Sequence, residues 1–61
     1  MCLSAVYEVR GGNETLVCEH VSAINIGEGT VTLTDIMGDE MVVTGVLKSI
    51  DLAKNIIKIA V

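Results

Sequence analysis

Turn signals recur at short intervals along this chain and leave segments that suit strands better than helices. The signals are RGGN at 10–13, GEG at 27–29, MGDE at 37–40 and LAKN at 52–55. Glycine, asparagine and aspartate favour tight turns, because glycine accepts a positive φ and the short polar side chains bond nearby backbone. The intervening segments are rich in β-branched residues, which favour strands. The sequence therefore predicts an all-β fold.

The predicted strands are half-buried and antiparallel, because apolar and polar residues alternate along several of them. Val31 and Leu33 share one face of their segment, and Ile57 and Ile59 share one face of theirs. The predicted strands cover 3–9, 15–21, 30–36, 41–51 and 56–61, and 23–26 forms a further short strand or a brief coil.

Gly45 interrupts the segment 41–51, which is too long for one straight strand of a small sheet. A glycine inside a strand pattern commonly marks a bulge or corner, and such a corner lets one strand serve two sheets. We therefore expect a single domain over residues 1–61, a small antiparallel β-barrel of five to six short strands.

The size of the chain predicts a homodimer. A chain of 61 residues buries only about 60% of its unfolded surface, so it is marginally stable alone. Its residues are 51% apolar with only one aromatic, Tyr7, and two cysteines are too few for a disulfide scaffold. A two-fold homodimer is the simplest way to bury the surplus apolar surface.

Charge and hydropathy exclude several classes of partner. The net charge is −4 and the bases are scattered as Arg10, Lys48, Lys54 and Lys58, so we expect no nucleic-acid partner. No apolar run approaches the roughly 20 residues that span a bilayer. The first residues lack the pattern of a signal peptide, which predicts a cytoplasmic protein.

Cys2 is the first candidate metal ligand, because it directly follows the initiator methionine. If Met1 is removed, the thiolate and the free α-amine form a five-membered chelate ring; if Met1 stays, the backbone amide replaces the amine. Two copies of Cys2 near a two-fold axis would supply sulfur and nitrogen to one ion. A planar set suits Ni(II) or Cu(II), and a tetrahedral set suits zinc.

Cys18 and His20 form a second candidate pair, since residues two apart in a strand leave the same face. Leu16 shares that face, and free cysteine is commonly buried, so we expect Cys18 to be a core residue. His20 is expected to be solvated, with metal binding as its alternative.

The remaining polar residues predict neither a calcium site nor an enzyme. The acids Asp35, Asp39 and Glu40 flank MGDE without the spacing of a calcium loop, and they are expected to form a solvated hairpin tip. The one histidine would have to serve every catalytic scheme, so catalysis is not expected.

The start MCLSAVY, the segment TLTDIMGDEMVVTG and IDL before a closing apolar strand resemble the CooT family of small nickel-binding accessory proteins. The resemblance covers essentially the whole chain. It implies a homodimer of small SH3-like β-barrels, Ni(II) as the metal, Cys2 as its ligand and a nickel enzyme such as carbon monoxide dehydrogenase as the client.

Two functions are consistent with these features of the sequence. The first is a metallochaperone-like accessory protein that holds one Ni(II) between the two Cys2 residues of a homodimer. The alternative is a small β-barrel interaction module that binds RNA or a protein partner and has no metal role; the net charge argues against RNA.

Overall fold

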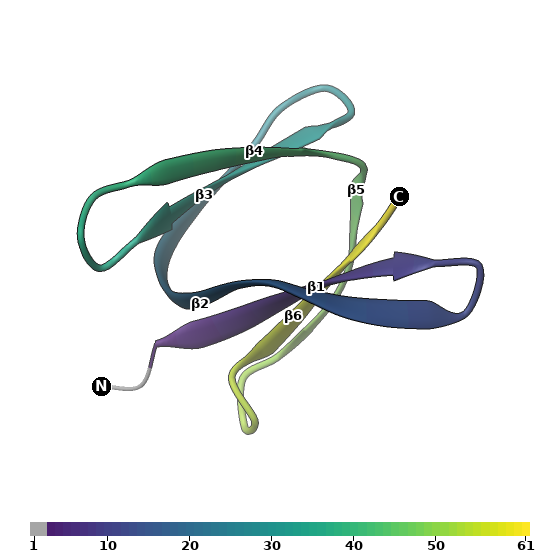
Figure 1. Cartoon of the computed structure of the whole chain (residues 1–61), viewed down its shortest axis with the longest axis horizontal. Helices are drawn as coiled ribbons and strands as arrows, with labels where there is room; N and C mark the ends of the chain where they lie inside the picture. Colours follow the sequence, from purple (N-terminus) through teal and green to yellow (C-terminus); the bar gives the residue numbers. More distant parts are fainter. Residues whose placement is uncertain (1–2) are drawn as a thin grey trace.

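The computed structural model describes residues 3–61 and contains six strands, as shown in Figure 1. The all-β prediction is confirmed. Across the described residues there is no helix long and apolar enough to cross a membrane. The strands are β1 (Ser4–Arg10), β2 (Asn13–Ile26), β3 (Thr30–Asp35), β4 (Glu40–Thr44), β5 (Val46–Asp51) and β6 (Ile56–Ala60).

All six strands lie in one curled sheet in the order β4-β3-β2-β1-β6-β5. The prediction of a wholly antiparallel sheet is wrong at one ladder, because β1 and β6 run parallel from Ala5↔Ile56 to Val9↔Ala60. No hairpin joins these two strands, so no turn fixes their relative direction. The other four ladders are antiparallel.

The predicted closed barrel is also wrong, because β4 and β5 are the two edges of the sheet. Closure would require a ladder between β4 and β5. These strands are separated by Gly45 alone, and a hairpin needs a loop of at least about two residues. The two edges therefore meet at a corner and do not pair along their length (Figure 1).

Gly45 makes this corner, so the bend predicted there is confirmed. A Cβ atom at Gly45 would lie 2.5 Å from the carbonyl oxygen of Ala60 and 2.9 Å from Cγ1 of Val61. The Gly45 amide donates to the Gly29 carbonyl at 2.9 Å. Glycine is needed here because backbone passes where a side chain would begin.

Strand β2 is longer than predicted and includes the segment 23–26, which is confirmed as strand. Its first half pairs with β1 and its second half with β3, and Figure 1 shows the bend between the halves. The register is irregular on both sides of this bend. His20 there has a φ of 59°, which is unusual for a residue other than glycine.

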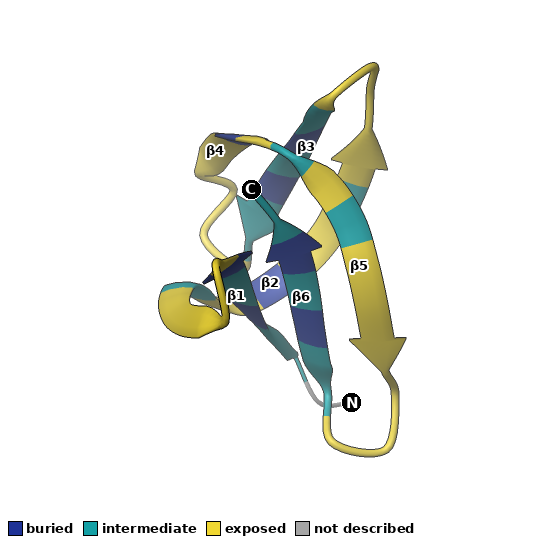
Figure 2. Ribbon diagram, turned by 90° about the vertical axis from the view of Figure 1, so that its right-hand side faces the viewer, coloured by how far each residue is buried: buried dark blue, intermediate teal, exposed yellow. Residues whose placement is uncertain are grey.

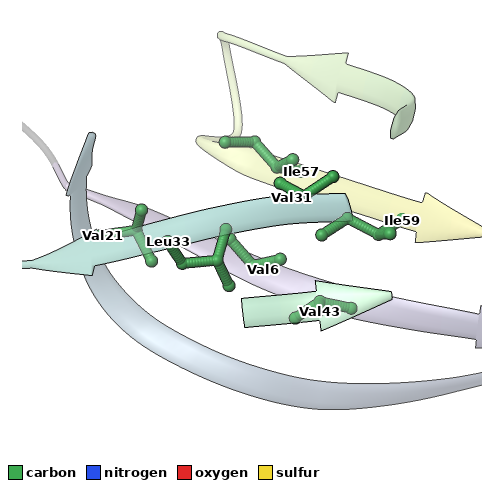
Figure 3. Packing of buried hydrophobic residues seen from close by; sticks show 7 residues of the cluster. All are labelled: Val6, Val21, Val31, Leu33, Val43, Ile57 and Ile59. Carbon is green, nitrogen blue, oxygen red and sulfur yellow. The ribbon is translucent and has the colours of Figure 1, made fainter. Parts of the chain in front are cut away.

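The core lies on the concave side of the sheet and consists of aliphatic side chains from five strands. The alternation predicted for β3 and β6 is confirmed, because their inward residues are the buried ones (Figure 2). Full burial of one such side chain contributes roughly 1.5–3 kcal/mol. The cluster in Figure 3 comprises Val6, Val21, Val31, Leu33, Val43, Ile57 and Ile59.

Candidate metal and docking sites

Cys2, the predicted nickel ligand, lies outside the described residues. The nearest described element is β1, whose first residue, Ser4, pairs with Val21 of β2. The next amide, that of Ala5, donates to the Asn55 carbonyl at 2.9 Å. The beginning of β1 is thus held between the bend of β2 and the turn that joins β5 to β6.

Cys18 is partly buried and packs against the core cluster, in agreement with the prediction of a core residue. Its Sγ also lies 3.6 Å from the carbonyl oxygen of its neighbour Glu19, as a weak donor. The prediction that Leu16 shares the face of Cys18 is wrong. Leu16 is 45% exposed, whereas Val17 packs against the core, because the register shifts between Val6 and Tyr7.

His20 is exposed, and the prediction that it shares the face of Cys18 does not hold. The ladder passes from Ser4↔Val21 to Val6↔Cys18, so β2 carries one more residue than β1 across this interval. Cys18 and Val21 both contact the core although strict alternation would put them on opposite faces. The left-handed φ of His20 accommodates the extra residue, and this interruption removes the basis for a chelating pair.

The acids around MGDE form a turn, as predicted. The Asp35 carboxylate accepts hydrogen bonds from the amides of Met37 at 2.9 Å and Asp39 at 3.0 Å. These bonds close the hairpin tip between β3 and β4. Within residues 3–61 no three histidine, cysteine, aspartate or glutamate side chains come together in a way that could hold a metal ion.

The β5–β6 hairpin carries a feature that the sequence pattern did not predict. Three of the four bases lie on this hairpin, as Lys48, Lys54 and Lys58, so the bases are less scattered in the fold than expected. An open groove of about 540 Å³ runs beside two of them, Lys54 and Lys58. Counting charge by segment rather than over the whole chain would have revealed this concentration. The groove is lined by Ser49, Ile50, Asp51, Leu52, Lys54, Ile56 and Lys58.

Comparison with known proteins agrees with the resemblance carried by the N-terminal segment. The family model for the CO dehydrogenase accessory protein CooT matches residues 1–60. A search of curated proteins gave no match. A crystal structure described as that of a CooT protein from Carboxydothermus hydrogenoformans is similar with a TM-score of 0.86 and 25% identity, over 97% of this chain and 95% of the other. The chain therefore belongs to the CooT family, a family of accessory proteins rather than enzymes.

Proposed function

We propose that this protein is a cytoplasmic nickel-binding accessory protein, and that its homodimer holds one Ni(II) between two Cys2 residues. Its client would be carbon monoxide dehydrogenase or another nickel enzyme. The observation that carries the proposal is the family match over residues 1–60, which includes the cysteine directly after Met1. Nickel is then cargo that the protein delivers.

The donor chemistry supports a shared site. Cys2 of a single chain supplies too few ligands for Ni(II). Two Cys2 thiolates, one from each chain, together with two nitrogens complete a four-coordinate set. The described residues offer no competing cluster. The chain has two cysteines, and Cys18 packs against the core. Cys2 is therefore the better candidate for the thiolate ligand.

The exposed apolar surface supports the homodimer. Among residues 3–61, nine large apolar side chains are exposed, which is a large number for so small a chain. Ile50 and Leu52 lie on β5 and on the turn after it, and the other seven, which come from β2, the β3–β4 turn, β4 and the start of β5, are the ones available to a dimer interface. The nine are Leu16, Ile26, Ile36, Met37, Met41, Val42, Val46, Ile50 and Leu52.

The experiment that tests the proposal is a nickel titration followed by native mass spectrometry and near-ultraviolet absorption. We expect one Ni(II) per dimer and thiolate-to-metal charge-transfer bands that disappear in Cys2→Ser. Affinity should fall as the pH is lowered, because protons compete with the metal for the thiolate. The dimer mass should persist in Cys2→Ser, since a residue so close to the terminus adds little stability.

Cys18→Ser is the matched control. It should lower stability through lost packing and retain the nickel bands, because Cys18 contacts the core. Loss of nickel in Cys18→Ser or His20→Ala with retention in Cys2→Ser would assign the metal to β2. A monomer at every concentration would remove the shared site altogether.

A further inference from the structure

The outer side of β5 is a free strand edge. In the sheet order β5 is last and pairs only with β6. Of the backbone hydrogen bonds outside the ladders of the described residues, none involves Val46–Asp51. A strand in this position presents unpaired N–H and C=O groups to solvent, and such edges accept an added strand from a partner.

A bulge at Lys48 limits which part of this edge is usable. The ladder passes from Leu47↔Ile59 directly to Ser49↔Lys58, so Lys48 is the extra residue. Bulges and edge lysines hinder the continuous pairing of one sheet edge with another. The regular stretch that remains covers residues 49–51, and this stretch borders the groove.

The groove offers apolar contacts next to the free edge. Leu52 is 80% exposed and Ile50 is 51% exposed, so both side chains gain from being covered. Ile56 adds a half-buried apolar wall, and Lys58 stands opposite Ser49 in the ladder. Figure 2 shows that most of β5 and the following turn are exposed. We call residues 49–52, 54, 56 and 58 the β5–β6 surface.

The charges of this hairpin favour an acidic partner. Residues 46–60 carry three lysines and Asp51, a net charge of +2, within a chain of net charge −4. The Asp51 carboxylate is occupied by the amides of Ala53 and Lys54, both at 3.0 Å. The ion pair found among the described residues is that of Lys58 with Glu14, which leaves Lys48 and Lys54 available to a partner.

We propose that the β5–β6 surface binds an extended segment of the client protein in which acidic and apolar residues alternate. The segment adds a short strand to residues 49–51, places apolar side chains against Ile50 and Leu52, and directs carboxylates towards Lys48 and Lys54. This inference rests on the proposed accessory function and adds the chemistry by which the client is recognised.

A second copy of the chain is a poorer occupant of this surface. The acidic strand that another copy could offer is β4, which follows Asp39 and begins at Glu40. Pairing β4 of one copy with β5 of the next, repeated in one direction, is head-to-tail and leaves one unpaired edge at each end. Such contacts propagate into filaments unless a rotation closes them.

The experiment uses the full chain labelled with nitrogen-15 and an acetylated, amidated heptapeptide in which glutamate alternates with valine. We expect saturable amide shifts at residues 49–51 in low salt, which weaken as salt is added. A peptide with lysine in place of each glutamate should bind at least about tenfold more weakly, because it meets like charge.

Two charge-reversal variants and two apolar-to-glutamine variants locate the site, with one of each pair inside the β5–β6 surface and one outside it. Lys54→Glu and Leu52→Gln should each weaken the binding of the glutamate peptide several-fold. Arg10→Glu changes a base on the β1–β2 hairpin, and Met37→Gln changes a side chain that is 82% exposed at the β3–β4 tip. These two controls should leave the affinity unchanged.

The absence of saturable shifts, equal binding of the lysine peptide, or shifts confined to β4 would overturn the inference. It would also fail if Leu52→Gln or Lys54→Glu converted the dimer to monomers, since the β5–β6 surface would then be the dimer interface. Nickel binding is measured on the same samples. Peptide binding without nickel refutes the metal role alone, and nickel binding without peptide binding refutes the docking site alone.

Discussion

The β3–β4 and β5–β6 hairpins are alike in construction and opposite in charge. Each includes an edge strand, and each turn is closed by an aspartate that accepts two backbone amides. Residues 30–44 carry three acids and no base, whereas residues 46–60 carry three bases and one acid. The backbone makes both edges available for pairing, and the side chains decide which partner each edge accepts.

The hairpins also contribute unequally to stability. Strand β3 buries Val31 and Leu33 almost completely, while Leu52 at the tip of the β5–β6 hairpin is 80% exposed. Both hairpins are anchored through their inner strands, since β6 buries Ile57 and Ile59, and they differ at the edge, where β4 buries Val43 and no residue of β5 is buried. Because Leu52 is exposed, it contributes little to folding stability. It can contribute to binding when a partner covers it.

The largest expected effect comes from comparing a buried leucine of the β3–β4 hairpin with an exposed leucine of the β5–β6 hairpin. Leu33→Ala should lower the free energy of unfolding by about 2–5 kcal/mol, because a fully buried side chain leaves a cavity. Leu52→Ala should change it by less than about 0.5 kcal/mol, since the side chain is mostly exposed. Urea unfolding at a fixed protein concentration measures both.

If Leu33→Ala fails to fold, Ile59→Val gives a smaller test of the same core, with an expected loss of about 1 kcal/mol. If Leu52→Ala lowers the free energy of unfolding as much as a core substitution does, the claim that Leu52 contributes little to folding is wrong. In that case the tip would already be covered in the free protein.

The second effect concerns the corner between the two edges. Gly45→Ala should cost about 1–3 kcal/mol, because its Cβ would meet the backbone oxygen of Ala60. Gly27→Ala is the matched control: its Cβ would lie 2.8 Å from Oγ1 of Thr30, a side-chain atom that can rotate away. Its cost should be below about 1 kcal/mol, and equal costs in thermal unfolding would contradict the role of the corner.

The third effect compares the two turn aspartates. Asp35→Ala and Asp51→Ala each remove an acceptor of two amides, and each should lower stability by about 1 kcal/mol. The two asparagine variants keep the acceptor oxygen and should lose less. Thermal unfolding of the four variants measures these losses, and a large difference between the alanine variants would show that the two tips are not built alike.

The smallest effect concerns the ion pair that links the basic hairpin to β2. The Nζ of Lys58 lies 2.8 Å from Oε2 of Glu14, and both side chains are partly exposed. Lys58→Gln and Glu14→Gln should each cost less than about 1 kcal/mol, and a double-mutant cycle should show coupling that declines with salt. Coupling that is independent of salt would refute a surface ion pair.

The sequence predicted those features that depend on local pattern. Alternation placed Val31, Leu33, Ile57 and Ile59 inside, and the glycine at 45 marked the corner. The direction of β6 against β1 was missed, because no turn connects the two strands. The altered face of His20 was missed as well, since a bulge depends on the register between strands rather than on the residues of one strand.

The candidate sites differ in the same way. The thiol of Cys2 could be singled out because its position after Met1 carries a family resemblance. The β5–β6 surface could not be recognised as a surface, because its groove depends on which residues oppose one another across the β5–β6 ladder, as Ser49 opposes Lys58. The concentration of lysines in residues 46–60 was visible in the sequence, whereas the groove beside Lys54 and Lys58 was not.

The parallel ladder between β1 and β6 has a consequence for synthesis of the chain. It joins the first strand to the last, and β6 brings Ile57 and Ile59 into the core. The sheet therefore cannot be completed until β6 has left the ribosome, and folding is delayed by the high contact order of this pairing. Until then the nascent chain exposes its apolar core residues, so loss of the last strand should send the protein to proteolysis rather than leave a smaller fold.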